Sequence, residues 1–180
     1  MYKIIGLVVG ACIVFAVYAC TVRKGPKKEP PGVVPGVDIN RYAGFWYEIA
    51  RYPNNFQKDC FGSTATYSVR EDGTIGVVNS CRKGAPDGPE KKVSGKAWVV
   101  DPDTHAKLKV RFFWPFSGNY WILQLDDSYR YAVVGNPSRT YLWILSRTPT
   151  LDTATYTAIC EKLKAEGFDP DKLIRTPQQG

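Results

Sequence analysis

Catalytic chemistry has few candidates in this 180-residue chain. The single histidine, His105, lies in a predicted turn close to Asp103, with no cysteine or serine in a recognisable catalytic arrangement nearby. The sequence has no Gly-x-Ser-x-Gly turn, no phosphate-binding loop and no pair of metal ligands at a typical spacing. We interpret Glu48 as a solvated or hydrogen-bonded structural carboxylate. The sequence therefore predicts a protein that is not an enzyme and holds no metal or cofactor.

The many aromatic residues indicate instead that the protein binds a ligand. The chain has five Trp, eleven Tyr and eight Phe, which either pack a β-sheet core or line a cavity. Most ligand sites are apolar, so a lined cavity is the functional interpretation. The formal net charge of +7 favours anionic partners such as lipid headgroups or fatty carboxylates. No segment combines a concentrated basic stripe with stacking aromatics, and nucleic acid is not an expected partner.

Trp46 and Arg147 are the pair of residues that most strongly indicates a particular fold, although they are far apart along the chain. A guanidinium that lies on an indole ring contributes about 0.5–2 kcal/mol. Gly44 lets the backbone turn tightly just before the tryptophan. Such a contact would join the first strand to the last and close a barrel.

Eight turn-separated strands and one late helix are the elements that must position these residues. The helix is predicted over 153–166, with Asp152 as its N-cap and Gly167 as its stop. No helices separate the strands, which disfavours a parallel sheet. The predicted strands are 45–51, 63–70, 75–81, 93–100, 106–113, 120–125, 130–135 and 141–146.

Three motifs in this order resemble those of the lipocalin family. Gly44-Phe45-Trp46 resembles the Gly-x-Trp signature, Arg147 resembles the third motif, and the segment 125–131 resembles the second with a wider spacing. The similarity runs from about 37 to 175 and is greatest to bacterial outer-membrane lipoprotein lipocalins, relatives of apolipoprotein D. It implies an all-β, eight-stranded antiparallel up-and-down barrel with one C-terminal α-helix on its wall. Lipocalins are a known example of an eight-stranded barrel that holds one small ligand, so this resemblance implies such a ligand here.

The N-terminus reads as an export signal over 1–19, with Lys3 followed by an uncharged apolar run. Val17-Tyr18-Ala19-Cys20 resembles a lipobox, which would place a lipid on Cys20; an uncleaved membrane anchor is the alternative. Thr21 in place of an aspartate resembles lipoproteins sorted to the outer membrane. We therefore expect a lipid-anchored outer-membrane protein whose domain, residues 37–180, faces the periplasm. Removal of 1–19, which holds one lysine and no acid, leaves a formal charge of +6.

Residues 20–36 then comprise the modified cysteine and a flexible tether rich in Pro, Gly and Lys. We expect this tether to hold the domain clear of the membrane surface. The sequence leaves the oligomeric state open, with a homodimer as one alternative.

An oxidising compartment predicts that the other cysteines are bonded or buried. A tight turn at Asp72-Gly73 predicts a register in which paired residue numbers sum to about 145. Tyr67 then pairs with Val78, and Cys81 lies near Cys60 on the outer face. Cys60–Cys81 is one candidate disulfide. Cys60–Cys160 is the other, because it resembles a bridge in other lipocalins.

Similarity to the pockets of apolipoprotein D-like relatives implies Tyr67, Phe112, Tyr120 and Trp143 as ligand-binding residues, although each is also consistent with plain core packing. The predicted function is binding of an amphipathic lipid, a fatty acid or lysophospholipid, for storage, transport or scavenging. Two alternatives are a lipid-acting enzyme on the same barrel and a structural lipoprotein whose barrel is filled by side chains.

Overall fold

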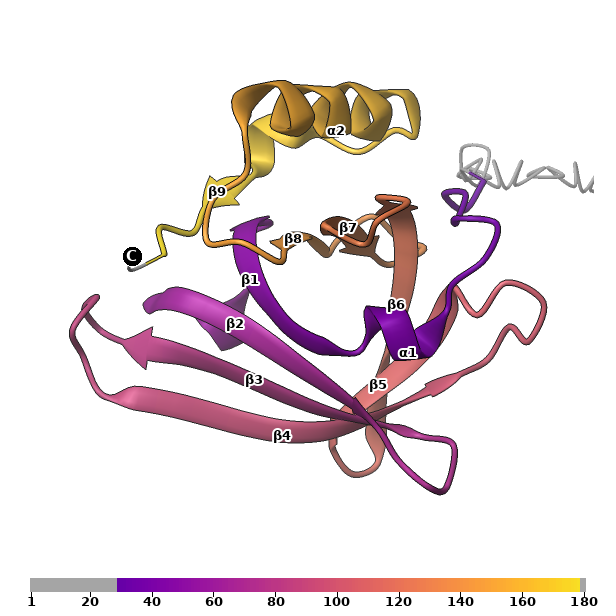
Figure 1. The fold of residues 1–180 in the computed structure, drawn as a ribbon. Coiled ribbons are helices and arrows are strands. Elements are labelled where there is room, and N and C mark those ends of the chain that lie inside the picture. The colour runs from indigo at the N-terminus through magenta and orange to yellow at the C-terminus, as the bar shows by residue number, and fades with distance from the viewer. Residues whose placement is uncertain (1–28, 179–180) are drawn as a thin grey trace, which may run out of the picture.

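The computed structural model describes residues 29–178, whose strands form one antiparallel sheet that closes on itself (Figure 1). The strands are β1 (Gly44–Arg51), β2 (Cys60–Val69), β3 (Ile75–Lys83), β4 (Glu90–Val99), β5 (Lys107–Phe113), β6 (Phe116–Leu125), β7 (Tyr131–Gly135), β8 (Leu142–Ser146) and β9 (Ile174–Arg175). The helices are α1 (Ile39–Tyr42), α2 (Thr153–Ala165) and the 3₁₀-helices η1 (Asn55–Gln57) and η2 (Pro170–Lys172).

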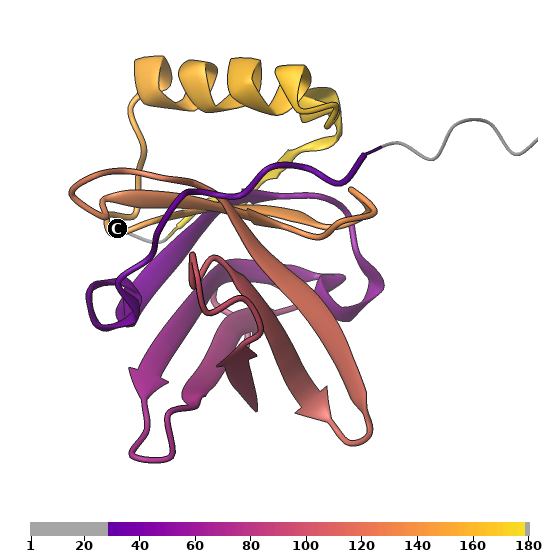
Figure 2. The same ribbon diagram turned by 90° about the vertical axis from the view of Figure 1, so that its right-hand side faces the viewer.

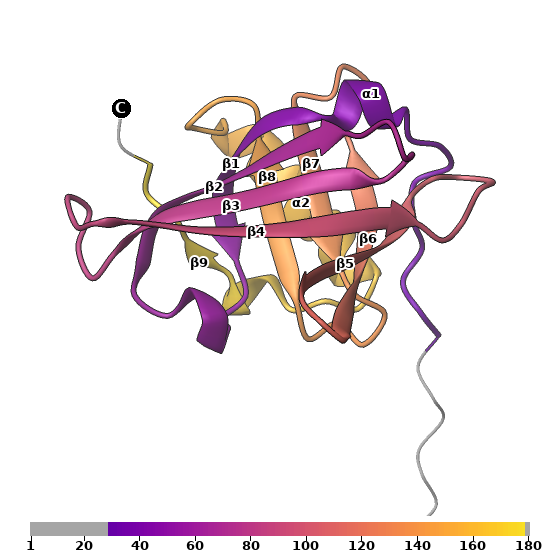
Figure 3. The same ribbon diagram turned by 90° about the horizontal axis from the view of Figure 1, so that it is seen from below.

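Strand pairing follows chain order from β2 to β8, and β1 closes the barrel by pairing with both β8 and β2. The predicted eight-stranded up-and-down barrel with one C-terminal helix is thus confirmed. β9 was not predicted; it pairs with the end of β1 at Ala50 and Arg51. Successive connections of such a barrel lie at opposite ends. We call the end that carries α1 the closed end and the other the open end; Figure 3 shows α1 at its upper right and the β1–β2 and β3–β4 connections of the open end at its lower left and left.

Two layers of apolar packing follow from the alternation of side chains along each strand. One layer fills the barrel interior and includes Trp46, Tyr67 and Val77. The other lies between the outer wall and α2, which runs along the wall in Figure 2 and buries Ile159 and Leu163 there. Full burial of a side chain of this size contributes about 1.5–3 kcal/mol. These two residues therefore attach the helix to the barrel.

The ends of α2 are set by its predicted capping residues. The side chain of Asp152 accepts a hydrogen bond from the Thr155 amide at 2.9 Å, and Gly167 has the positive φ of +79° that ends a helix. Cys160, predicted as a buried residue of the apolar stripe, is half-buried with a free thiol. Within residues 29–178, no helix has the length and apolar character needed to cross a membrane.

The register between β2 and β3 differs by one residue from the predicted one. Tyr67 pairs with Val77, and Val78 points outward with 37% of its surface exposed. The cause is the turn: Arg70 bonds Thr74, which leaves a three-residue loop instead of a two-residue one. Gly73 supplies the positive φ that this loop requires. A shift of one residue reverses the face of every side chain that follows.

Three strands also begin closer to the open end than predicted: β2, β4 and β6. The largest difference is in β6, which starts at Phe116 where the prediction began at position 120. Ser117, Gly118 and Asn119 have the composition of a turn, yet Val110 and Lys109 of β5 pair with Gly118 and Asn119. Pairing with the neighbouring strand outweighs local propensity here.

Residues 29–36 belong to the folded domain, although they were predicted as part of a free tether. Pro31 is buried, the Val34 amide bonds the Ile122 carbonyl at 3.1 Å, and the Arg139 guanidinium donates to the Glu29 carbonyl at 2.9 Å. This segment runs along β6 from the open end to α1. The predicted signal peptide, the lipidation site at Cys20 and the rest of the tether lie outside the described residues.

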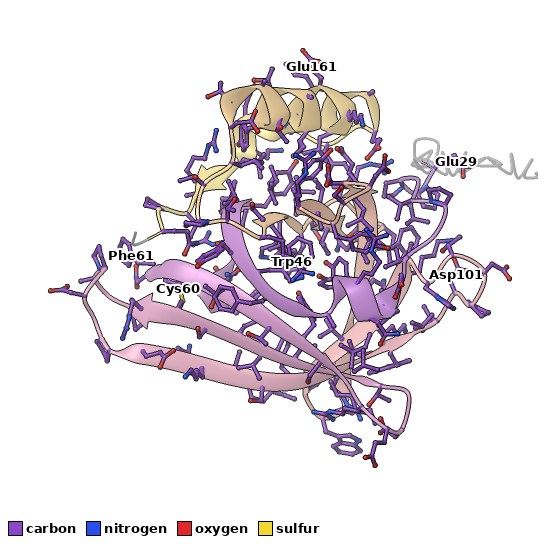
Figure 4. The ribbon with its side chains drawn as sticks, in the orientation of Figure 1. Glu29, Trp46, Cys60, Phe61, Asp101 and Glu161 are labelled. Atoms are coloured by element: carbon purple, nitrogen blue, oxygen red, sulfur yellow. A yellow bond between two sulfur atoms is a disulfide. The ribbon has the colours of Figure 1, made fainter. Side chains whose placement is uncertain are left out.

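Trp46 and Arg147 meet at the closed end. Trp46 is fully buried, and its Nε1 donates to the Tyr42 carbonyl at 2.8 Å; Figure 4 shows it inside the barrel. The Arg147 guanidinium lies 3.7 Å from the indole centroid and donates to four carbonyls within 41–45 at 2.8–3.1 Å. Gly44 has φ +96°, and a Cβ there would lie 3.3 Å from Arg147 Nη1. We call this contact of Arg147 with Trp46 and the carbonyls of 41–45 the clasp. It requires the arginine, the tryptophan and a glycine at position 44 together.

Arg147→Lys should lower the free energy of unfolding by about 2 kcal/mol, because lysine keeps the charge but has no planar fork for the carbonyls and the indole. Urea unfolding measures this loss. The matched control is Arg130→Lys: this side chain is 77% exposed and pairs with Asp126, so its loss should stay below about 1 kcal/mol. Equal small losses in both variants would show that the clasp does not hold the barrel closed.

Candidate ligand site inside the barrel

The inner face of the barrel changes from buried to exposed along its length. Nearer the closed end, inward-facing Ile75 and Leu108 are buried. Nearer the open end, inward-facing Val93 and Phe112 are half-buried and Gly118 is exposed. Solvent therefore reaches the interior from the open end. We call this accessible part of the interior the cup; its inner face includes Val93, Phe112 and Gly118.

Side chains fill the closed half. The cavity there has a volume of about 10 Å³, with Tyr42, Tyr67 and Tyr120 among its lining residues. A volume of this size holds about one water molecule. Neither a hydrocarbon tail nor a headgroup fits below these tyrosines, which form the floor of the cup.

The floor is a hydrogen-bonded set of three tyrosine hydroxyls. The Tyr120 hydroxyl lies 2.6 Å from that of Tyr42 and 2.8 Å from that of Tyr67. Burial raises the pKa of Tyr67 to about 12 and also raises the pKa of the other two, so all three stay protonated at neutral pH. Three hydroxyl hydrogens make only two bonds within the set. One hydroxyl hydrogen thus has no partner within the set.

Gly95 determines where the Phe112 ring can lie. A Cβ on Gly95 would come within 2.7 Å of both the Phe112 ring and the Arg111 carbonyl, a distance that real contacts do not allow. The absent side chain lets the ring lie directly against the backbone of β4. Phe112 therefore covers the wall of the cup at this point.

Trp143 lies on the opposite part of the wall, next to a polar group of residues at the open end. Its Nε1 donates to Gln57 Oε1 at 2.9 Å, and its ring stacks on Tyr141 with centroids 5.8 Å apart. Gln57 also donates to Glu48 Oε2 at 2.6 Å. The tryptophan is half-buried, so part of its ring is available to a ligand.

Glu48 is a buried carboxylate, only 4% exposed, held by three partners. Besides Gln57, it accepts from Thr176 Oγ1 at 2.6 Å and pairs with Arg51 Nε at 3.2 Å. Its pKa is raised because burial disfavours the charged form more than these partners favour it. The sequence interpretation of a hydrogen-bonded carboxylate agrees with this geometry.

The C-terminal tail fills a gap in the barrel wall beside this carboxylate. β1 pairs with β2 only as far as Tyr47. Beyond this point Gln178 Nε2 donates to the main-chain oxygens of Glu48 at 2.7 Å and Ser63 at 3.0 Å. Sequence analysis missed Gln57, Thr176 and Gln178, because neither a loop nor a tail carries a periodic signal for such long-range contacts.

The four predicted ligand residues all lie in or against the interior cluster, but not in one group. Tyr67 and Tyr120 meet at the floor, Phe112 lies on Gly95, and Trp143 lies apart near the open end. Within residues 29–178, no three His, Cys, Asp or Glu side chains are grouped so that they could hold a metal ion.

The disulfide joins Cys60 to Cys81, as the first of the two candidates predicted, and Cys160 is free. The expectation that Cys81 faces outward was wrong. Cys81 shares the parity of Ile75 and Val77, which point into the barrel, and it is 8% exposed. The one-residue change of register explains the difference. Its sulfur is unavailable as a nucleophile because it is bonded.

Comparison with known proteins agrees with this geometry. The family model described as a lipocalin-like domain matches residues 37–178. The chain belongs to the lipocalin family. This lipocalin is 42% identical to the outer membrane lipoprotein Blc of Escherichia coli, over 99% of both chains. It is 42% identical to temperature-induced lipocalin-1 of Arabidopsis thaliana, over 84% of this chain and 85% of that one.

More distant relatives share the barrel. Mouse apolipoprotein D is 35% identical over 84% of this lipocalin and 82% of its own length. Among solved structures, insecticyanin from the tobacco hornworm Manduca sexta matches with a TM-score of 0.64 at 23% identity, covering 86% of each chain. The cockroach allergen Per a 4 matches with a TM-score of 0.63 at 23% identity, over 85% of this lipocalin and 97% of its own chain. At such low identity the structural matches show the fold alone.

The raised pKa of Glu48 predicts a specific pH dependence of stability. Between the ordinary value of 4.5 and the raised one, the folded state binds more protons than the unfolded state. The contribution of this group is therefore fully present at low pH and is lost as the pH rises through the raised pKa. In Glu48→Gln this loss should disappear, so the variant gains stability relative to the native protein as the pH rises above 4.5.

Urea unfolding at a series of pH values measures this difference. The control is Glu71→Gln, which changes an exposed carboxylate in the β2–β3 turn. A constant offset between Glu48→Gln and the native protein at every pH would contradict a buried carboxylate with a raised pKa.

Proposed function

We propose that this lipocalin binds an amphipathic lipid, a fatty acid or a lysophospholipid, in the open half of its barrel, for storage, transport or scavenging. The observation that carries the proposal is the apolar inner face that becomes accessible toward the open end, above a floor of tyrosine hydroxyls. The tail lies against Phe112, Tyr120 and Trp143. The headgroup stays at the open end, because the closed half has room for about one water molecule.

We also propose that the chain is anchored in the outer membrane through a lipid on Cys20. The lipobox-like sequence Val17-Tyr18-Ala19-Cys20 supports this, as does full-length similarity to proteins named outer membrane lipoprotein. The domain then faces the periplasm. The binding of small hydrophobic ligands fits the family, and catalysis has no support from the buried, hydrogen-bonded Glu48 or the disulfide-bonded Cys81.

Affinity should rise with the length of the lipid tail and then level off. Each buried methylene contributes about 0.8 kcal/mol, offset in part by the ordering of the tail. Because the tyrosine floor limits the depth of the cup, additional methylenes beyond that depth remain in water. Titration of lysophospholipids with increasing tail length, followed by intrinsic tryptophan fluorescence, measures this dependence.

Trp143→Ala should weaken binding about tenfold or more, because it removes part of the wall that the tail contacts. The matched control is Trp98→Ala on the outer face of β4, where the ring contacts Arg111 and not the interior; its affinity should not change. Equal affinity for all tail lengths, with no loss in the Trp143 variant, would falsify lipid binding in the cup. Native mass spectrometry of protein from its host then identifies the bound lipid.

A further inference from the structure

The tip of the β5–β6 hairpin exposes a group of large aromatic side chains to solvent. Phe113, Trp114 and Phe116 have 72%, 82% and 77% of their surfaces exposed, the three highest values among large hydrophobic side chains in the part of the chain that the structure describes. Only Pro115 separates them. Exposure of three neighbouring aromatic side chains to water is unfavourable. This indicates that the surface binds a partner.

Two more exposed aromatic residues lie at the same end of the barrel. Phe56 in η1 is 58% exposed and Tyr141 before β8 is 40% exposed, with their ring centroids 5.8 Å apart. Tyr141 in turn stacks on Trp143 of the cup. Phe56 and Tyr141 are thus continuous with the proposed lipid site. We call Phe56, Phe113, Trp114, Phe116 and Tyr141 the aromatic rim.

The charge next to the hairpin has one sign. Between Lys109 and Leu125 the chain contains Lys109 and Arg111 and no acidic residue. Lys107, at the closed end of β5, pairs with Asp101 at 3.6 Å. Bulky aromatic side chains beside basic ones are the combination that binds the interface of a membrane with anionic headgroups. A hydrophobic protein partner would not require this charge.

The path of the N-terminal segment brings the open end toward the membrane. The hydrogen bond from Arg139 to the Glu29 carbonyl holds residue 29 beside the β7–β8 connection, which lies at the open end. Figures 1 and 2 show that the segment beginning at residue 29 starts on the α2 side of the barrel, whereas the β5–β6 hairpin lies on the opposite side of the open end. Cys20 is nine residues earlier in the sequence, a span of about 30 Å at most. Arg23, Lys24, Lys27 and Lys28 lie within that span.

We propose that the aromatic rim docks on the bilayer that holds the chain's own anchor, so that lipid passes between the bilayer and the cup without crossing water. This inference rests on the proposed function for the lipid and for the anchor. The rim is an interaction surface, and its partner is an anionic lipid bilayer. It differs from the sequence-based expectation that the tether holds the domain clear of the membrane.

Fluorescence quenching tests the contact itself. The chain as its host produces it is reconstituted into vesicles of phosphatidylethanolamine and phosphatidylglycerol whose acyl chains carry bromine. Trp114 emission should be quenched, and Trp114→Phe should remove most of the quenched signal. Trp98→Phe, which removes a tryptophan from the outer face of β4, should leave it unchanged. The same quenched signal in both variants would overturn the proposal, and this readout does not depend on whether the cup binds lipid.

Lipid transfer tests the consequence. In a variant with Phe113, Trp114 and Phe116 all replaced by serine, transfer of a fluorescent lysophospholipid between vesicles should slow by about tenfold. Its equilibrium affinity for the same lipid in solution, and its urea midpoint, should stay unchanged because these side chains are exposed. Unchanged transfer with intact binding would overturn the docking proposal alone. No binding in the native protein would instead overturn the proposed function.

Sedimentation of the serine variant separates the bilayer from the other candidate partner. If the native protein forms a dimer that the variant loses, and Trp114 shows no quenching by brominated lipid, the rim belongs to an interface with a second copy and the proposal is wrong.

Discussion

Closure of the barrel depends on the contact between Arg147 and Trp46. β1 must pair with β8 on one side and β2 on the other, so its start is the place where the two ends of the sheet meet. The guanidinium covers the indole and also binds the carbonyls of 41–45, which fixes α1 against the closed end. The Tyr129 hydroxyl, which accepts from the Asp38 amide, holds α1 from the other side. One arginine thus links sheet closure to the floor of the cup through Tyr42, which ends α1.

The fold follows from the sequence because its signals are local. Alternation of polar and apolar residues, turn residues between strands and a capped helix each act within a few positions, and together they specify eight strands and α2. The register of β2 and β3 shows how far this reasoning extends. Pairing was predicted in the right place, but the number of residues in the turn at Gly73 decides which face Val77 and Val78 occupy. Composition alone does not distinguish a two-residue loop from a three-residue one.

Only part of the candidate site can be predicted from the sequence, because sequence signals act locally. Tyr67 and Tyr120 are recognisable as inward aromatic residues, although the hydrogen bond between Tyr120 and Tyr42 depends on where α1 lies. The polar group around Glu48 joins positions far apart, such as Thr176, 128 residues later in the chain. It forms because β1 leaves β2 and the tail fills the gap. No local pattern encodes a gap in a sheet.

The distribution of polarity inside the barrel decides what the cup can accept. A neutral tyrosine floor offers a lipid no charged partner, since burial raises the pKa of all three hydroxyls and keeps them protonated. The charged groups Glu48 and Arg51 neutralise each other in the wall. An anionic headgroup therefore has no charged partner at depth. At the open end the β3–β4 turn carries Lys83, Lys91 and Lys92, of which Lys83 pairs with Asp59 and Lys92 with Glu90. Under the proposed function, this distribution orients the lipid with its tail toward the tyrosine floor and its headgroup at the open end.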